Sequence, residues 1–320
     1  MPGASQMDNL IIRPLEEADL DEADRVMRLA FGTFVGLADP MTMFGDADMA
    51  RTRFRSNPDG ALAAQLDGRL VGSNFLANWG SVGFFGPLSV DPPLWERKIA
   101  RRLLDPTMEL FKKWGMRHIG LFTFAQSPKH IALYQKYGFW PRYLTAVMDK
   151  KVEAGRLAPN VQLFSTLDAA GQKTALADTR EMLASIYEGL DVTQEIESIA
   201  RQKIGDTVLL RSGSHVDAVA TCHIGKGSEA GSGSCYIKFG AVRPDEGAAE
   251  AFEKLFEACE RVAAASGANE LEAGVNTERH AAYRAMLARG FRTFLTGVSM
   301  QHGNDRGYNR QNLFLLDDWR

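Results

Sequence analysis

Cysteine is scarce in this 320-residue chain, and the few cysteines form no pattern that binds a metal or builds a disulfide framework. There are three, an odd number, without the paired short spacing of a zinc site: Cys222, Cys235 and Cys259. Small secreted domains that depend on disulfides are far richer in cysteine. We therefore expect no disulfide framework and no bound metal, and the composition favours a reducing, cytoplasmic location.

Long hydrophobic runs and an excess of basic residues are also missing. No apolar stretch approaches the roughly 18 residues of a membrane span, and the N-terminal residues lack the charged and apolar segments of a secretion signal. Lys and Arg number 37 against 40 Asp and Glu, a net charge of −3. Residues 1–150 carry 18 basic and 17 acidic residues, and 151–320 carry 19 and 23, so neither half resembles a nucleic-acid binder. We expect neither a membrane nor nucleic acid as a partner.

The length of the chain predicts two domains. A single hydrophobic core rarely serves 320 residues, and domains of about 150 residues are common. With 45% hydrophobic and 24% charged residues and a mean hydropathy of −0.21, the composition is that of an ordinary globular protein.

The stretch 86–139 reads as strand, turn, helix, strand and helix. Its first strand contains Leu88-Ser89-Val90 and ends at a proline, and a basic turn over 95–100 opens an amphipathic helix. A second apolar run covers 119–124, and a short helix stops at Gly138-Phe139. In such a unit the N-terminus of the first helix is a natural phosphate site. A closing strand is expected over 143–148.

The second half repeats this order of elements. Each half has a hairpin, a strand ending in Val-x-Pro, a long helix stopped by glycine, a strand, and a short helix ending in Gly-Phe. From Val90 to Phe139 is 49 positions, and from Val242 to Phe291 is also 49. A closing strand over 296–300 completes the match. The chain is therefore predicted to be a tandem repeat of one domain.

These motifs resemble the GCN5-related N-acetyltransferase (GNAT) superfamily. The resemblance rests on the strand ending in Val-x-Pro, the turn before the long helix, and the run Ala132-Leu133-Tyr134 to Gly138-Phe139, and it covers nearly the whole chain. It implies an α/β fold with an α+β mixed sheet, in two tandem acyl-CoA N-acyltransferase (GNAT-like) domains. We expect a catalytic domain over 8–150, a linker over 151–160, and a degenerate domain over 161–320.

The resemblance also implies acetyl-CoA as co-substrate, held by strand and loop backbone. The residues carried over from the family's motif are Leu88, Ser89, Val90, Trp95, Glu96, Arg97, Lys98, Ile99, Ala100, Arg101 and Ser127. Trp95 replaces the family's Arg or Gln and Lys98 replaces a glycine, whereas Ala100 keeps the small final residue. Backbone N–H groups of this loop would cradle the pyrophosphate beside added cations. The alternative to phosphate binding is that these basic residues form the solvent-exposed start of a helix.

By the same resemblance, Tyr134 is the general acid that protonates the departing thiolate, and the Val90 N–H is the candidate oxyanion donor. The alternative for Tyr134 is packing on the sheet. No base is assigned; the carboxylates near the expected substrate loop are Glu16, Asp39, Asp46 and Asp48. In the second copy Met286 stands at the tyrosine position, and its loop carries carboxylates instead of cations.

The resulting prediction is an enzyme that transfers an acetyl group from acetyl-CoA to a primary amine. The acceptor is a small molecule or a peptide, and the chain acts as a monomer or homodimer. The competing interpretation is a non-catalytic, CoA-binding regulatory or structural module, which the changes at Trp95 and Lys98 favour. The residues leave open the acceptor, the acyl-chain length, the general base, and whether the second domain binds CoA.

Overall fold

The computed structural model describes residues 9–153, 155, 158, 160–213 and 215–320. In the first half the regular elements are β1 (Leu10–Pro14), α1 (Leu20–Val35), α2 (Met49–Ser56), β2 (Ala61–Leu66), β3 (Arg69–Trp79), β4 (Val82–Phe85), β5 (Ser89–Val90), α3 (Ile99–Lys113), β6 (His118–Phe124), α4 (Pro128–Gln135) and β7 (Phe139–Lys151). Short 3-10 helices lie at η1 (Glu17–Asp19), η2 (Pro40–Thr42), η3 (Pro58–Gly60) and η4 (Pro92–Leu94).

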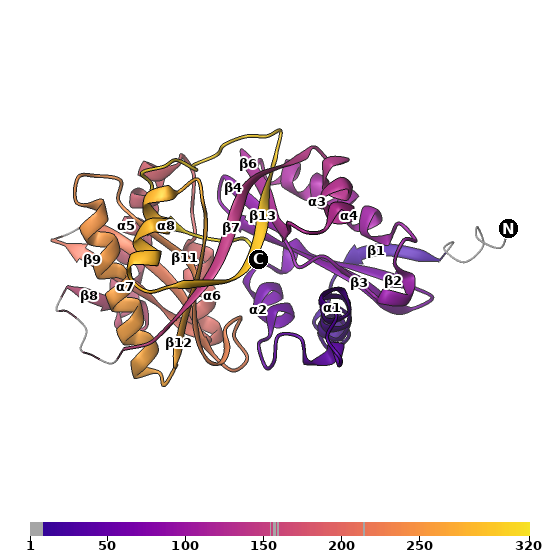
Figure 1. Cartoon of the computed structure of the whole chain (residues 1–320), viewed down its shortest axis with the longest axis horizontal. Coiled ribbons are helices and arrows are strands. Elements are labelled where there is room, and N and C mark those ends of the chain that lie inside the picture. The colour runs from indigo at the N-terminus through magenta and orange to yellow at the C-terminus, as the bar shows by residue number, and fades with distance from the viewer. Residues whose placement is uncertain (1–8, 154, 156–157, 159, 214) are drawn as a thin grey trace.

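The second half has nearly the same order of elements. They are β8 (Val161–Leu163), α5 (Ala169–Ile186), α6 (Thr193–Gln202), β9 (Gly205–Ser212), β10 (His215–Gly225), β11 (Gly231–Val242), α7 (Ala248–Ala265), β12 (Glu270–Asn276), α8 (His280–Ala288), β13 (Arg292–His302) and β14 (Leu315–Leu316), with a 3-10 helix at η5 (Phe164–Thr166). The second half differs in having the single strand β11 before its long helix and an additional strand, β14, at the end. The predicted mixed α/β fold and the predicted tandem arrangement are confirmed, and Figure 1 shows the two halves side by side.

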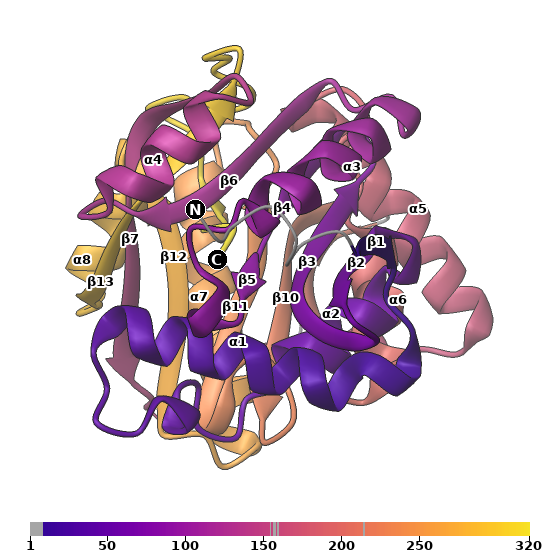
Figure 2. The ribbon, with the colours of Figure 1, turned by 90° about the vertical axis from the view of Figure 1, so that its right-hand side faces the viewer.

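Side chains of β2 alternate between the two faces of the sheet, and each face is covered by different helices. Ala61 and Ala63 of β2 pack with α1 and α2, whereas the neighbouring Leu62 and Ala64 pack with α3 and α4. Successive side chains of a strand point to opposite faces, so one strand serves two cores. Figure 2 shows α1 lying across the sheet, away from α3 and α4.

The two halves exchange their last long strands. The sheet order is β1-β2-β3-β4-β6-β13-β7-β12-β11-β10-β9-β8, so β13 lies between β6 and β7 of the first half, and β7 lies between β13 and β12 of the second. Thr145 of β7 shows the arrangement, because it faces Gly297 of β13 on one side and Asn276 of β12 on the other. One continuous sheet therefore runs through both halves.

The hydrophobic core is also shared between the halves. Trp79 and Phe84 of the first half lie in one buried cluster with Phe239 of β11 and residues of α5 and α6. The ring of Trp79 meets Phe84 and Phe239 edge-on, at 4.7 and 5.1 Å between centroids. The division into 8–150, 151–160 and 161–320 stays a prediction, and positions 154, 156–157 and 159 of the predicted linker lie outside the described residues.

Candidate active site

The first half contains an opening in the sheet between β5 and β6. Parallel pairing of β4 with β6 runs from Val82 opposite His118 to Phe85 opposite Leu121 and then stops. The chain shifts at Gly86, and β5 continues along β3 only, with Ser89 opposite Ser73. Within the described chain no strand pairs with the other edge of β5. The change of direction at Gly86 thus separates two neighbouring strands.

Backbone groups of β5 face this opening. The Asp91 N–H donates to the Val71 carbonyl at 2.9 Å, so Asp91 bonds toward β3. Residues of an antiparallel strand alternate between bonding toward one neighbour and toward the other. The amide and carbonyl of Val90 therefore face away from β3, and those of Ser89 face toward it. The Val90 carbonyl accepts a hydrogen bond from Nε1 of Trp95 at 2.7 Å, which ties one of the predicted loop residues to the rim.

The predicted phosphate loop leads into the first turn of α3. Lys98 is the residue that precedes the helix, and its backbone adopts φ 65°, the left-handed region that favours glycine. Glu96 also has a positive φ, 69°. Lysine therefore occupies a backbone conformation that favours glycine, at the cost of backbone strain. Arg101 and Arg102 donate their amides to the Lys98 carbonyl, while Ile99 and Ala100 begin the helix, where N–H groups lack intrahelical acceptors.

The charges of this loop are exposed. Glu96, Arg97 and Lys98 all lie at the surface. Glu96 accepts a hydrogen bond from Lys129 of α4 at 2.9 Å, which lowers the pKa of Glu96. The positive charge of Lys129 therefore offsets the negative charge of Glu96. The remaining cations border a helix N-terminus, where the helix dipole also favours an anion.

Tyr134 lies in the same buried cluster as Phe85 of β4 and Val90 of β5. Its ring packs edge-on against Phe85, the last paired residue of β4, at 5.7 Å between centroids. The side chain is buried, and burial raises the pKa of Tyr134 above its ordinary value. Its hydroxyl makes no hydrogen bond to any residue the structure describes. The phenol is therefore protonated at neutral pH and has a proton to donate.

Ser127 caps the start of α4. It is buried before α4, and its hydroxyl accepts a hydrogen bond from the His130 N–H at 3.4 Å. The four candidate base carboxylates also have local partners. Asp39 accepts from the Met41 N–H and Asp48 from the Arg51 N–H, and Asp46 accepts from Ser232 of the second half. Glu16 belongs to a capping box with Asp19. None of these contacts marks a base.

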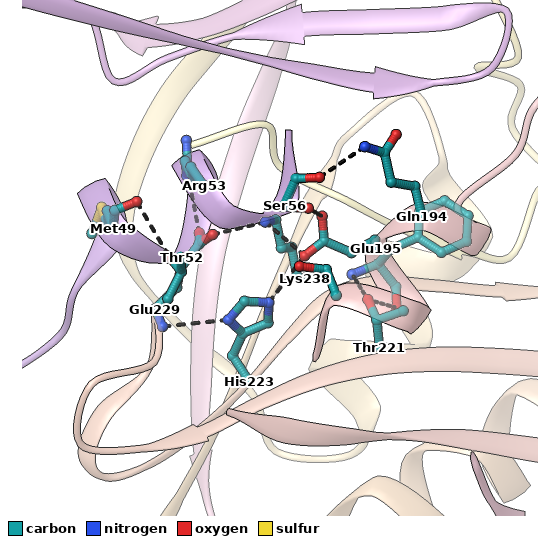
Figure 3. A network of polar contacts seen from close by, with 12 residues as sticks. Met49, Thr52, Arg53, Ser56, Gln194, Glu195, Thr221, His223, Glu229 and Lys238 are labelled. Carbon is teal, nitrogen blue, oxygen red and sulfur yellow. Dashed lines mark hydrogen bonds and ion pairs between the residues drawn. The ribbon is translucent and has the colours of Figure 1, made fainter. Parts of the chain in front are cut away.

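Sequence reasoning missed a buried network of charged side chains between the halves (Figure 3). Arg53 of α2 donates to Glu229 at 2.7 Å, and Glu229 also accepts from Lys238 at 2.7 Å. Lys238 donates to Glu195 at 2.9 Å, and His223 lies 3.2 Å from the same carboxylate oxygen. All five side chains are buried, so each charge depends on its partners.

The network reaches the opening through Arg53. Its Nη1 donates to the Gly86 carbonyl at 2.5 Å, where β4 breaks from β5. Burial alone would raise the pKa of Glu229, but Arg53 and then Lys238 lower it well below its usual range. Burial would likewise raise the pKa of Glu195, but Lys238 and His223 hold it at about 2. Both carboxylates are therefore ionised, which balances the two cations.

No local sequence signal marks this network. Its members come from α2, α6, β10, β11 and the turn between the last two, and no two share a motif spacing. A pocket between the halves lies beside it and is lined in part by Arg53, Gly86, Glu195 and Lys238, with Phe75, Trp79 and Phe84.

A comparison with protein-family models matches residues 25–139 to the acetyltransferase (GNAT) family. The match includes β4, β5, α3 and α4, hence the opening, the cationic loop and Tyr134. A comparison with curated proteins found no match.

Solved structures with the GNAT fold align over nearly the whole chain. A Pyrococcus horikoshii protein provisionally described as an acetyltransferase shares 14% identity over 96% of this chain and 94% of its own, with a TM-score of 0.64. A tandem GNAT protein from the clavulanic acid biosynthesis pathway shares 14% over 91% and 98%, with a TM-score of 0.56. At this identity the likeness shows the fold, and the fold is that of two GNAT-like domains in tandem.

No helix in the described ranges is long and apolar enough to cross a membrane. Among the same residues no group of His, Cys, Asp and Glu could hold a metal ion. The three cysteines are free and buried.

Proposed function

We propose that the first half is an acetyl-CoA-dependent N-acetyltransferase acting on a primary amine. The proposal is supported by the opening between β5 and β6, since the Val90 amide faces away from β3 and Tyr134 packs in the same buried cluster as Val90. The unpaired edge of β5 fits the amide groups of pantetheine, which need extended backbone partners. The cationic start of α3 fits the pyrophosphate.

In this proposal acetyl-CoA supplies the thioester, and the chain supplies one proton and one hydrogen-bond donor. The Val90 N–H stabilises the carbonyl oxygen while the acceptor amine forms a bond to the carbonyl carbon. Tyr134 gives its proton to the sulfur as the carbon–sulfur bond breaks, and the proton lost by the amine passes to solvent, from which Tyr134 is reprotonated. Free CoA and an acetylated amine are the products.

The competing function is a CoA-binding module without turnover. Trp95 favours it, because its indole already bonds the Val90 carbonyl that would otherwise face pantetheine. Lys98 favours it too, since a side chain stands where the family's loop has glycine. Binding of CoA is common to both functions, and turnover separates them.

Isothermal titration with acetyl-CoA, followed by a thiol-release assay with a panel of primary amines, tests the proposal. Tyr134→Phe should lower kcat by about 100-fold or more, with unchanged CoA affinity and unchanged stability, because its hydroxyl has no described partner to lose. Tyr137→Phe is the matched control. The Tyr137 hydroxyl donates to Asp105 and to the Arg101 carbonyl, so this variant should lose stability and keep kcat. Full turnover by Tyr134→Phe would exclude its role as acid.

A further inference from the structure

The second half has the same opening, in the same register. From Val82 of β4 to Phe139, each residue has its counterpart 152 positions later, as Val242 follows Val90. Parallel pairing of β11 with β12 runs from Ser234 opposite Glu270 to Ile237 opposite Ala273. These are the counterparts of the first and last pairs of β4 with β6. In both copies the parallel pairing of the two strands therefore stops at the same point. We call the gap between the strands beyond that point the slot.

In the second copy a segment of the same chain fills the slot. β14 runs antiparallel to β11, with Leu316 opposite Gly240 and Leu315 opposite Ala241. The Val242 N–H donates to the Phe314 carbonyl at 3.2 Å. Gly240, Ala241 and Val242 are the counterparts of Leu88, Ser89 and Val90. The amide equivalent to the proposed oxyanion donor is thus already bonded.

Side chains after β14 are held by buried partners. Asp317 pairs with Arg279 at 2.5 Å and accepts from the Tyr308 hydroxyl, and Asp318 accepts from the Tyr236 hydroxyl at 2.9 Å. The guanidinium of Arg320 lies 4.0 Å from the centre of the Tyr236 ring. These contacts fix the segment by charge as well as by backbone pairing.

The slot is also shaped for this segment. A Cβ at Gly274 of β12 would overlap the carboxylate of Asp318, so glycine permits the close approach. Trp319 stacks on Phe84 of the first half, with 5.7 Å between ring centroids and 7° between planes. The segment therefore joins the second slot to the shared core.

The loop that follows β11 lacks what a pyrophosphate needs. Asp245 and Glu246 precede α7, and after Arg243 the next cation in the sequence is Lys254, which pairs with Glu250. In the 152-position register, Ala249 and Glu250 are the counterparts of Arg97 and Lys98. The second copy has lost the charge for a phosphate and gained a peptide in the place of pantetheine.

We propose that residues 314–320 are an internal peptide ligand of the second slot, which leaves one CoA site per chain. The statement about CoA rests on the proposed function of the first half. The occupation of the second slot does not, because pairing within the chain does not depend on CoA.

Hydrogen–deuterium exchange on the whole chain tests the occupation. Without CoA the Val242 amide should exchange on the order of 100-fold more slowly than the Val90 amide, and CoA should slow only Val90. Equal exchange of the two amides without ligand, or protection of Val242 only after CoA is added, would overturn the proposal. Isothermal titration should give one CoA per chain, and two would also overturn it. Absence of CoA binding with Val242 protected would reject the proposed function and leave the internal ligand standing.

A second experiment adds the segment back as a separate peptide. A chain that stops at Leu313 should bind the peptide Phe-Leu-Leu-Asp-Asp-Trp-Arg one to one and regain thermal stability. A peptide with both Asp changed to Asn should bind at least tenfold more weakly, because Arg279 and Tyr236 lose charged partners. Equal binding of the two peptides, or none by a folded truncated chain, would contradict the proposal. If the truncated chain does not fold, the exchange measurement on the whole chain decides.

Discussion

Replacing Glu195 by Gln tests whether the buried network stabilises the junction between the halves. The Glu195 carboxylate accepts from Lys238 at 2.9 Å, from His223 at 3.2 Å and from the Ser56 hydroxyl at 3.3 Å. The variant keeps the shape of the side chain and removes its charge. Lys238 then keeps only Glu229 as a charged partner.

The pKa of Glu195 gives the size of its contribution to the free energy of unfolding. The carboxyl has an ordinary pKa of 4.5 and a pKa of about 2 in the folded chain. Each pKa step is worth about 1.4 kcal/mol, so ionised Glu195 contributes roughly 3 kcal/mol to the free energy of unfolding. Because the folded pKa is the lower one, this contribution is complete above about pH 4.5 and is lost as the pH falls toward 2. The cost of breaking a buried ion pair, about 3–5 kcal/mol, is similar.

Urea unfolding of the chain and of Glu195→Gln across pH 2 to 7 measures the effect. At pH 7 the variant should be less stable by about 3 kcal/mol, and the difference should shrink as the pH falls from 4.5 to 2. Glu197→Gln is the matched control, since Glu197 is exposed on the same helix, and it should change stability by less than about 0.5 kcal/mol. A constant difference between chain and variant at all pH values would refute the electrostatic argument.

Three further substitutions test other parts of the site. Lys98→Gly should raise the free energy of unfolding by about 1 kcal/mol, because glycine accepts the left-handed backbone, whereas Lys98→Ala should give no gain, and urea titration compares them. Gly274→Ala should lower the melting temperature in calorimetry by several degrees, since its methyl group would displace Asp318; an unchanged melting temperature would contradict the packing of the segment. Arg53→Lys keeps the charge but not the planar fork that reaches Gly86, so acetyl-CoA affinity in isothermal titration should fall by about threefold to tenfold.

Local patterns were sufficient to predict the repeat. The equal spacing from Val90 to Phe139 and from Val242 to Phe291 depends on strand and helix periods, which the sequence carries directly. The structure places both pairs at matching points of the two halves. The hairpin expected in the first half is also present. It turns at Asp67-Gly68, where both residues have positive φ, 50° and 82°, as an Asp-Gly hairpin turn requires.

The chemistry of the candidate site was only partly predictable. Tyr134 and the cationic turn follow from motif positions, and the structure brings Tyr134 to the end of β4. Trp95 could be recognised as a departure, but its bond to the Val90 carbonyl depends on how the loop folds back over the strand. Arg53 lies in a stretch with no motif, and its contact with Gly86 arises only after α2 packs against the sheet.

The sequence by itself determined the two copies, their order of elements, and the loss of cations and tyrosine from the second. Only the tertiary structure decided which strands lie together and what occupies the second slot. Closing strands such as β7 and β13 have the same local pattern whichever half they join, because strand pairing uses backbone groups that every residue has. The same holds for residues 314–316, whose short apolar run gives no hint of its partner. The exchange of strands, the buried network and the internal ligand follow from contacts between distant residues, which no local period records.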